Sequence, residues 1–234
     1  MKKAFILSAV IAISALLSSS VQAFAQDTET KTVKYTPDLK AIEKVVNKDR
    51  ARYDSLTESF LKMDSTTVFT PEEVAIIYYG YAFTSHYAPY GNYDNIRELI
   101  QKEDLEKAKA EALEAQINNP VSLELLYDLF IIADRTKDKE LFKNITLRMQ
   151  TILFHISKSG RGTEDSPMYV INVTDEYIFL NFAGVGQILG QSLVNTPSGQ
   201  CDKMDFKLED DNENTYTFYF NVDLPLSHLN KLFD

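Results

Sequence analysis

The spacing of hydrophobic residues changes once along the chain, close to Gly160 and Gly162. Before these glycines, over about residues 37–158, apolar side chains recur every three or four residues, which is the period of an amphipathic helix. After them, short runs rich in β-branched and aromatic residues alternate with turn sequences, as in strands. Helices that precede strands in this way indicate an α+β fold. We expect an antiparallel helical stack over 36–160 and a small antiparallel β-rich domain over 161–234, packed on the helices.

Short polar breaks divide the helical part and favour antiparallel neighbouring helices. Thr36-Pro37 starts the first predicted helix, because proline suits the first helical position. Thr70 starts the second with a capping box, in which it pairs with Glu73. The predicted helices cover about residues 37–62, 71–86, 94–101, 103–118, 121–135 and 138–158.

The helix predicted over 103–118 resembles the second helix of a tetratricopeptide repeat. Small residues at the family's spacing let two such helices approach closely, and a proline ends the helix. The resemblance is partial, because residues 84–102 intervene where the family has only a few residues. Leu126 and Leu129 fit the first helix of a following repeat, but Phe142, Thr146 and Met149 replace the small residues expected in its partner helix. It implies a short, degenerate helical-repeat stack. The residues that carry it are Ala108, Ala112, Ala115 and Pro120.

The part after Gly162 contains four runs of strand-forming residues separated by turn sequences. Thr174-Asp175-Glu176 precedes another apolar run, which ends at Ala183. This segment fits either a capped short helix or an additional strand, and we prefer the helix. Residues 226–233 are expected to close the chain as a docked terminal turn. The predicted strands cover 168–173, 191–195, 203–208 and 215–222.

The N-terminal residues predict export. Lys2-Lys3 precedes an apolar run over 4–17, and small residues follow up to Ala25, in the order found in secretory signal peptides. The run is shorter than the roughly 20 residues that span a bilayer, so a membrane anchor is the less favoured alternative. Cleavage after Ala25 would remove residues 1–25 and leave a polar, flexible lead over 26–35. We therefore expect a periplasmic or extracellular protein without a transmembrane segment.

The charge of the chain argues against a nucleic-acid partner. Its 24 basic and 34 acidic residues give a net charge of -10. Residues 159–234 alone contain 4 basic against 12 acidic side chains, a net charge of -8. Binding to a phosphate backbone needs clustered Lys and Arg, so we expect no nucleic acid to bind.

Motifs for cofactors and metals are missing from the sequence. There is no Gly-x-Ser-x-Gly elbow, no phosphate-binding loop and no complete dinucleotide fingerprint. Cys201 is the single cysteine, and His86, His155 and His228 lie too far apart in the chain for a compact zinc motif. The acidic run 209–213 lacks the pattern of a calcium loop and fits a solvated hairpin loop. We expect no cofactor and no metal.

A cluster of tyrosines is the most distinctive feature of the helical part. Six of the 13 tyrosines lie between residues 78 and 93. Exposed tyrosines suit the binding of peptides or sugars, because each offers a flat apolar face and a polar tip. The alternative is that they pack between the helices. The candidates for binding are Tyr78, Tyr81, Tyr87, Tyr90 and Tyr93.

Two classes of function follow from these patterns. The favoured one is a non-enzymatic protein- or peptide-binding module of the cell envelope, since helical stacks present extended surfaces. The alternative is a carboxylate-dependent hydrolase that acts on envelope or dietary polymers. Adjacent residues on a helix diverge by about 100°, which argues against Asp175 and Glu176 acting as a pair. The carboxylates considered for the hydrolase are Asp175, Glu176, Asp202 and Asp205.

Several short motifs together resemble an uncharacterised secreted family, a domain of unknown function found mostly in Bacteroides-like bacteria. The resemblance covers about 35–233, implies export and the helix-then-sheet order, and transfers no catalytic residue. It also suggests O-glycosylation, which such bacteria place at Asp followed by Ser or Thr. Ser65 and Ser55 fit that pattern. The motifs are Thr70-Pro71-Glu72-Glu73, Tyr78-Tyr79-Gly80-Tyr81, Ala88-Pro89-Tyr90, Asp175-Glu176-Tyr177, Gln191-Ser192-Leu193, Cys201-Asp202, Tyr219-Phe220-Asn221-Val222 and Pro225-Leu226.

Overall fold

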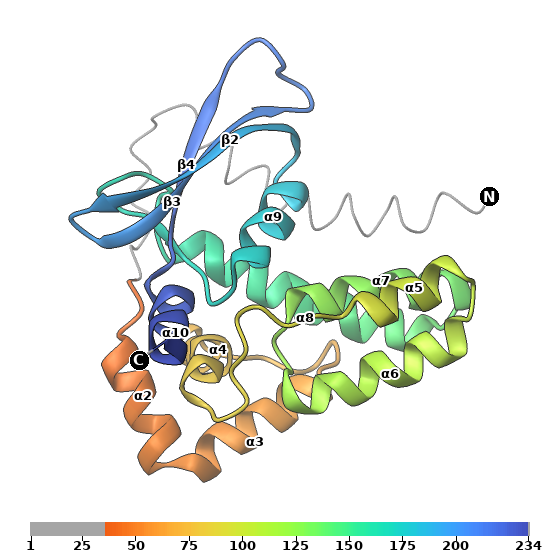
Figure 1. Ribbon diagram of the computed structural model, residues 1–234. Coiled ribbons are helices and arrows are strands. Elements are labelled where there is room, and N and C mark those ends of the chain that lie inside the picture. The colour runs from red at the N-terminus through yellow and green to blue at the C-terminus, as the bar shows by residue number, and fades with distance from the viewer. Residues whose placement is uncertain (1–35, 234) are drawn as a thin grey trace. The chain divides into compact units, whose positions relative to one another are not determined.

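The computed structural model describes residues 36–233, with side chains described as far as His228. The predicted signal peptide and flexible lead lie outside the described residues. The described chain forms two compact units, which divide between Ile152 and Leu153 (Figure 1). The α+β order expected from the change of hydrophobic period is confirmed.

The first unit is helical throughout. The predicted helices are confirmed in number and approximate place, with one exception. The first of them is two helices, because the chain leaves helical geometry at Asp49, where φ is -133° and the backbone N–H still donates to Val45 O. The elements are α2 (Leu39–Lys48), α3 (Arg50–Leu61), α4 (Pro71–Gly80), the 3-10 turn η1 (Tyr81–Phe83), α5 (Asp94–Gln101), α6 (Leu105–Asn118), α7 (Leu123–Thr136) and α8 (Lys139–Lys158), of which residues 153–158 belong to the second unit.

The capping box predicted at the start of α4 is present. Thr70 Oγ1 accepts a hydrogen bond of 3.2 Å from Glu73 N, and Glu73 Oε2 accepts one of 2.8 Å from Thr70 N. These two bonds satisfy backbone donors that the first turn of a helix leaves without intrahelical partners.

Replacing Thr70 with Ala should lower the free energy of unfolding by about 1 kcal/mol, because one cap is lost. Thermal unfolding of the variant checks this. Val68→Ala in the same connection is the control, since Val68 is 87% exposed. Equal melting temperatures for the two variants would contradict the assigned role of the cap.

An arginine lies in the core of the first unit. Arg148 of α8 is 2% exposed, and its guanidinium lies 4.9 Å from the centre of the Phe60 ring. It donates to Gln116 Oε1 at 3.0 Å and to Pro120 O at 2.7 Å. Burial lowers the pKa of Arg148 to about 9, so the side chain is still charged at neutral pH. Arg148 therefore joins α8 to the end of α6 through hydrogen bonds to neutral oxygens.

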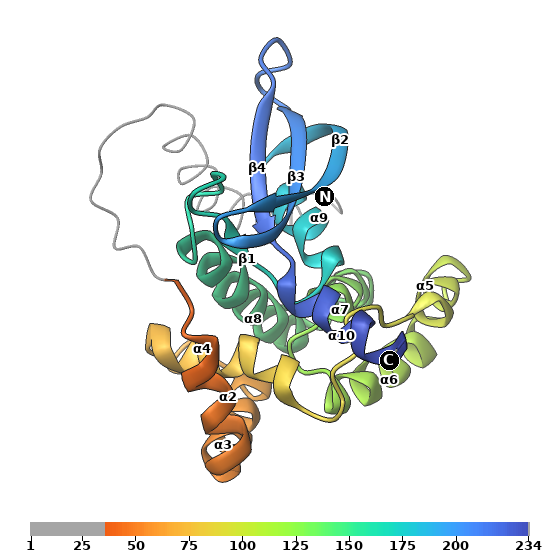
Figure 2. The same ribbon diagram turned by 60° about the vertical axis from the view of Figure 1, so that its left-hand side comes forward.

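The second unit is built around a four-stranded sheet in the order β1-β4-β3-β2 (Figure 2). β2 pairs antiparallel with β3, and β3 with β4. β1 pairs parallel with β4, so the prediction of a wholly antiparallel sheet is wrong for β1. The parallel pair arises because three elements intervene between β1 and β4. The elements are β1 (Met168–Tyr169), α9 (Val173–Phe182), β2 (Val185–Thr196), β3 (Gly199–Leu208), β4 (Tyr216–Asn221) and α10 (Asp223–Phe233).

Helix α9 covers one face of this sheet. The helical alternative for the segment before Ala183 is thus confirmed, and the chain ends in a helix, α10, rather than in a terminal turn. Phe179 of α9 packs against Phe220 of β4, with 5.8 Å between ring centroids. Asp202 lies opposite Phe220 in the ladder and therefore shares the face that α9 covers.

The β2–β3 hairpin is fixed at its turn. Gly199 has a φ of +116°, which a residue with a side chain rarely adopts. Asp223 Oδ1 accepts from Gln200 N at 2.9 Å, and Asn221 Nδ2 donates to Ser198 O at 2.8 Å. These bonds hold the turn end of β2 in a defined place.

Candidate functional site

The tyrosines singled out in the sequence lie mainly in the core of the first unit. Tyr78, Tyr81 and Tyr87 are 0%, 2% and 7% exposed. Tyr90 is 49% exposed, and Tyr93 is half-buried, with its hydroxyl accepting from Asn119 Nδ2 at 3.1 Å. Their burial assigns the first three to packing rather than to a contact surface.

Three of the four carboxylates considered in the sequence come together in the second unit. Asp175 and Glu176 lie in the first turn of α9 and are 0% exposed, and Asp202 of β3 is 7% exposed. Asn172 Nδ2 donates to Asp175 Oδ2 at 3.3 Å. Although neighbouring residues on a helix point in different directions, both side chains are buried.

Glu176 has the most strongly perturbed acidity in this group. Burial raises its pKa to about 10, and the nearby Asp202 and Asp175 carboxylates and a hydrogen bond with Asp202 act in the same direction. Glu176 is therefore protonated at neutral pH and donates toward Asp202. Neither Glu176 oxygen has a hydrogen-bond partner of regular geometry, so this contact is a loose one.

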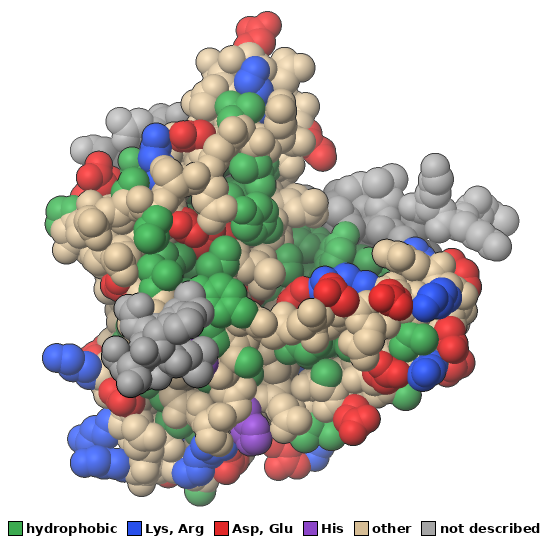
Figure 3. Space-filling view, viewed as in Figure 1, with side chains coloured by type: hydrophobic (Ala, Val, Ile, Leu, Met, Phe, Trp, Pro, Cys, Tyr) green, Lys and Arg blue, Asp and Glu red, His purple; other side chains and the backbone are tan. Residues whose placement is uncertain are grey.

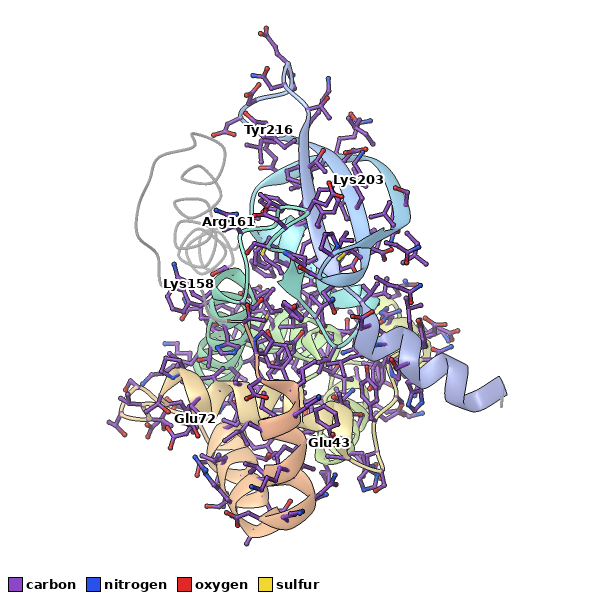
Figure 4. All side chains as sticks on the ribbon, turned by 90° about the vertical axis from the view of Figure 1, so that its left-hand side faces the viewer. Glu43, Glu72, Lys158, Arg161, Lys203 and Tyr216 are labelled. Carbon is purple, nitrogen blue, oxygen red and sulfur yellow. The ribbon has the colours of Figure 1, made fainter. Side chains whose placement is uncertain are left out.

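Asp205, the fourth carboxylate, does not join the group. It is three residues beyond Asp202 on β3, and side chains an odd number of residues apart point to opposite faces of a sheet. Asp205 instead accepts from Thr217 Oγ1 at 2.5 Å and from Lys203 Nζ at 3.2 Å (Lys203 is labelled in Figure 4). The Thr217 hydroxyl, and then Lys203, lower the pKa of Asp205.

The enclosed position of the acid pair argues against the hydrolase alternative. A protonated Glu176 beside Asp202 has the chemistry of a general acid and a general base. Glu176 is fully buried, however, and a polymer substrate has to reach the hydrogen-bonding distance of such groups. We therefore assign the pair to the internal structure beneath β2.

The outer edge of β2 is the accessible surface next to this pair. β2 is the last strand of the sheet, and within residues 36–233 no strand pairs with its outer side. Leu193, Leu189 and Ile188 are 54%, 45% and 37% exposed. Figure 3 shows hydrophobic side chains gathered over the strands of this unit. An edge that carries exposed apolar side chains and open backbone groups is a template for another strand.

The ladder shows which backbone groups of β2 face outward. Val222 N donates to Gln200 O, so the even-numbered residues of β3 bond toward β4. The odd-numbered ones then bond toward β2, where their partners are residues 190, 192 and 194. The N–H and C=O groups of Gln191, Leu193 and Asn195 consequently point to the outer side.

This edge lacks the usual protection against pairing. Exposed edges normally carry Lys, Pro or inward-pointing charges that prevent pairing with other chains. β2 has neither a charged residue nor a proline over its 12 residues, in a chain in which 25% of residues are charged. Its register shifts lie between 185 and 190, which leaves residues 190–196 as a regular, uncharged edge.

Gln191 connects this edge to the buried acid pair. The Tyr177 hydroxyl of α9 donates to Gln191 Oε1, and Gln191 Nε2 donates to Asp202 Oδ2 at 2.6 Å. α9 lies beside β2 in both ribbon views (Figures 1 and 2). The side-chain amide of Gln191 is thus held from both ends, which fixes the middle of the edge strand on α9 and β3.

A family model described as "Domain of unknown function (DUF4919)" matches residues 40–231. The chain belongs to this family. The match spans both units, so the family includes β2 and the acid pair as well as the helices. No curated protein and no solved structure matches the chain. Membership in the family assigns no activity to the chain.

Two further candidates from the sequence, a cysteine and a histidine, are buried in the fold. Cys201 is buried, and burial raises the pKa of its thiol. His155 is 5% exposed, and burial lowers its pKa to about 4.

In the described part of the chain, no group of His, Cys, Asp and Glu residues could hold a metal ion. No helix there is long and apolar enough to cross a bilayer.

The acidic run 209–213 forms the β3–β4 connection. Asp211 accepts from the Tyr216 hydroxyl at 2.6 Å and from Asn214 Nδ2 at 2.8 Å. Bonds from Asn214 and then from Tyr216 lower the pKa of Asp211 to about 2. The Asp211 carboxylate therefore stabilises the connection between β3 and β4 in which it lies.

Sequence reasoning missed the edge itself. A run such as Val185–Thr196 predicts a strand, but only the strand order shows that no other strand within residues 36–233 pairs with its outer side. The absence of charge along these 12 residues was the one signal that could have indicated a contact surface.

Proposed function

We propose that this chain is a non-enzymatic binding module of the cell envelope that binds an extended segment of another protein as an added strand on β2. The observation that carries the proposal is the uncharged, regular edge over residues 190–196. Strand addition obtains its affinity from main-chain hydrogen bonds, for which Gln191, Leu193 and Asn195 present donors and acceptors. Pockets and side chains at alternate positions then give specificity.

The side chains along the edge indicate the composition of the bound segment. Leu193 and Leu189 are about half exposed and offer apolar contacts. Residues 159–234 carry a net charge of -8, so an acidic segment would be repelled. A segment with apolar residues at alternate positions and few acidic residues fits this surface best.

The edge is rigid before a partner arrives. The side chain of Gln191 is held by Tyr177 and Asp202, and the turn at Gly199 is held by Asn221 and Asp223. A rigid template loses little conformational freedom on binding, which favours affinity.

The proposed location follows from the N-terminal sequence. A signal peptide over residues 1–25 would deliver the chain to the envelope, where its partner would be another exported protein. Ser65 lies in the exposed turn between α3 and α4, whereas Ser55 lies on the exposed face of α3. Ser65 is therefore the better proposed site for O-glycosylation.

The proposal is tested by selecting displayed random decapeptides on residues 26–234. Selected peptides should bind wild type and lose at least tenfold in affinity with Leu193→Pro, because this change removes an outward donor without removing a ladder bond. Leu193→Lys should weaken binding as well, since an edge charge opposes pairing. Ile117→Lys on α6 is the control, since Ile117 is 74% exposed.

Two results would overturn the proposal. One is equal affinity of the selected peptides for wild type and Leu193→Pro at equal melting temperature. The other is a wild-type dimer in sedimentation that Leu193→Lys dissociates, because the edge would then pair with a second copy of the chain.

A further inference from the structure

A pocket lies at the turn between α7 and α8, inside the first unit. It has a volume of about 240 Å³ and is formed by residues between 133 and 143. It is independent of the β2 edge, which belongs to the second unit. None of the residues singled out in the sequence lines it.

The interior of the pocket is apolar. Ala133 is 1% exposed, and Phe142 packs against Phe130 with 4.8 Å between ring centroids. The lining lysines add their aliphatic stems to these walls, because long charged side chains keep only the ammonium group in water. The pocket therefore favours an apolar body.

The acidic residues of the rim already have cationic partners. Asp134 Oδ1 lies 3.2 Å from Lys137 Nζ. Asp138 Oδ2 lies 2.5 Å from Lys109 Nζ, and its Oδ1 accepts from Leu141 N at 3.1 Å. Both carboxylates are thus occupied by interactions within the unit.

Two lysines of the rim have no such partner. Lys139 and Lys143 lie four residues apart on α8, both exposed, and neither forms an ion pair with a described residue. Lys139 also lies in the first helical turn, where the helix dipole disfavours a cation. The rim of an apolar pocket consequently carries two lysines without an ion-pair partner among the described residues, in a chain with a net charge of -10.

We infer that this pocket binds a medium-chain fatty acid, with the alkyl chain inside and the carboxylate between Lys139 and Lys143. The small volume of the pocket, about 240 Å³, favours a short alkyl chain. The volume also lies below the range of roughly 300–1,000 Å³ that is typical of pockets for larger ligands.

Calorimetric titration of the mature chain with octanoate tests the inference. Octanoate should bind, and 1-octanol and octylammonium should bind at least about fivefold more weakly, because they lack the anionic group. The double variant Lys139→Glu/Lys143→Glu should lose at least about tenfold in octanoate affinity. Lys40→Glu/Lys44→Glu is the matched control, since these lysines are also exposed, four residues apart on α2 and without an ion pair.

Three results would overturn the inference. The first is the absence of binding at millimolar octanoate, and the second is equal affinity of both double variants at unchanged melting temperature. The third is displacement of octanoate by vesicles with anionic headgroups but not by uncharged vesicles, which would assign the site to a membrane surface.

Discussion

Replacing Arg148 with Ala should lower the free energy of unfolding of the first unit by about 3–5 kcal/mol. The change creates a cavity against Phe60 and leaves two acceptors, Gln116 Oε1 and Pro120 O, buried without their donor. An orphaned buried acceptor costs its full desolvation penalty, which is why the loss exceeds that of one ordinary hydrogen bond. Urea denaturation followed by amide exchange in α6 and α7 measures the effect.

Two further variants separate the effect of the cavity from the effect of the lost hydrogen bonds on the free energy of unfolding. Arg148→Met keeps most of the volume and removes only the donors, so it should cost less than Arg148→Ala. Arg52→Ala is the matched surface control, because Arg52 pairs with Glu72 at 3.2 Å in an exposed ion pair that contributes about 1 kcal/mol or less. A loss below about 1 kcal/mol for Arg148→Ala would show that the buried guanidinium has no part in stability.

Replacing Glu176 with Gln should stabilise the second unit at neutral pH by about 2–3 kcal/mol. The carboxyl has a pKa of about 10 in the fold, against an ordinary value of 4.5. Between these values the folded chain holds a proton that the unfolded chain has lost, so unfolding releases a proton and stability falls as the pH rises. Gln does not titrate, and its amide can donate toward Asp202 as the protonated Glu does.

The difference in the free energy of unfolding between wild type and Glu176→Gln has a defined pH dependence. It should be small near pH 4.5 and grow as the pH rises toward 10, which denaturation at a series of pH values measures. Glu164→Gln, an exposed carboxyl of the same unit, should change stability by less than about 0.5 kcal/mol. A difference that does not change with pH would mean that Glu176 is ionised in the fold.

Local signals predicted the elements of the fold well. The capping box at Thr70 and Glu73 and the change of period near Gly160 depend on neighbouring residues only, so they are visible in the sequence. The parallel pairing of β1 with β4 depends on the path of the chain through α9, β2 and β3, which no local pattern records.

The candidate site was less accessible to sequence reasoning. Glu176 and Asp202 are 26 positions apart, and their contact exists only because α9 packs on the sheet. The tyrosines illustrate the opposite case, since Tyr78 suits both a binding surface and a core, and only its burial decides between them. In both cases the role of the side chain depends on tertiary packing more than on the residue type.

Amide hydrogen exchange along β2 shows whether this strand receives another strand. A chain of residues 26–234 is measured with and without a decapeptide selected on it. Exchange of the outward amides of Gln191, Leu193 and Asn195 should slow at least tenfold on binding, while exchange in α6 stays unchanged. Slowed exchange in α6 with these three amides unaffected would show that the peptide binds elsewhere and adds no strand to β2.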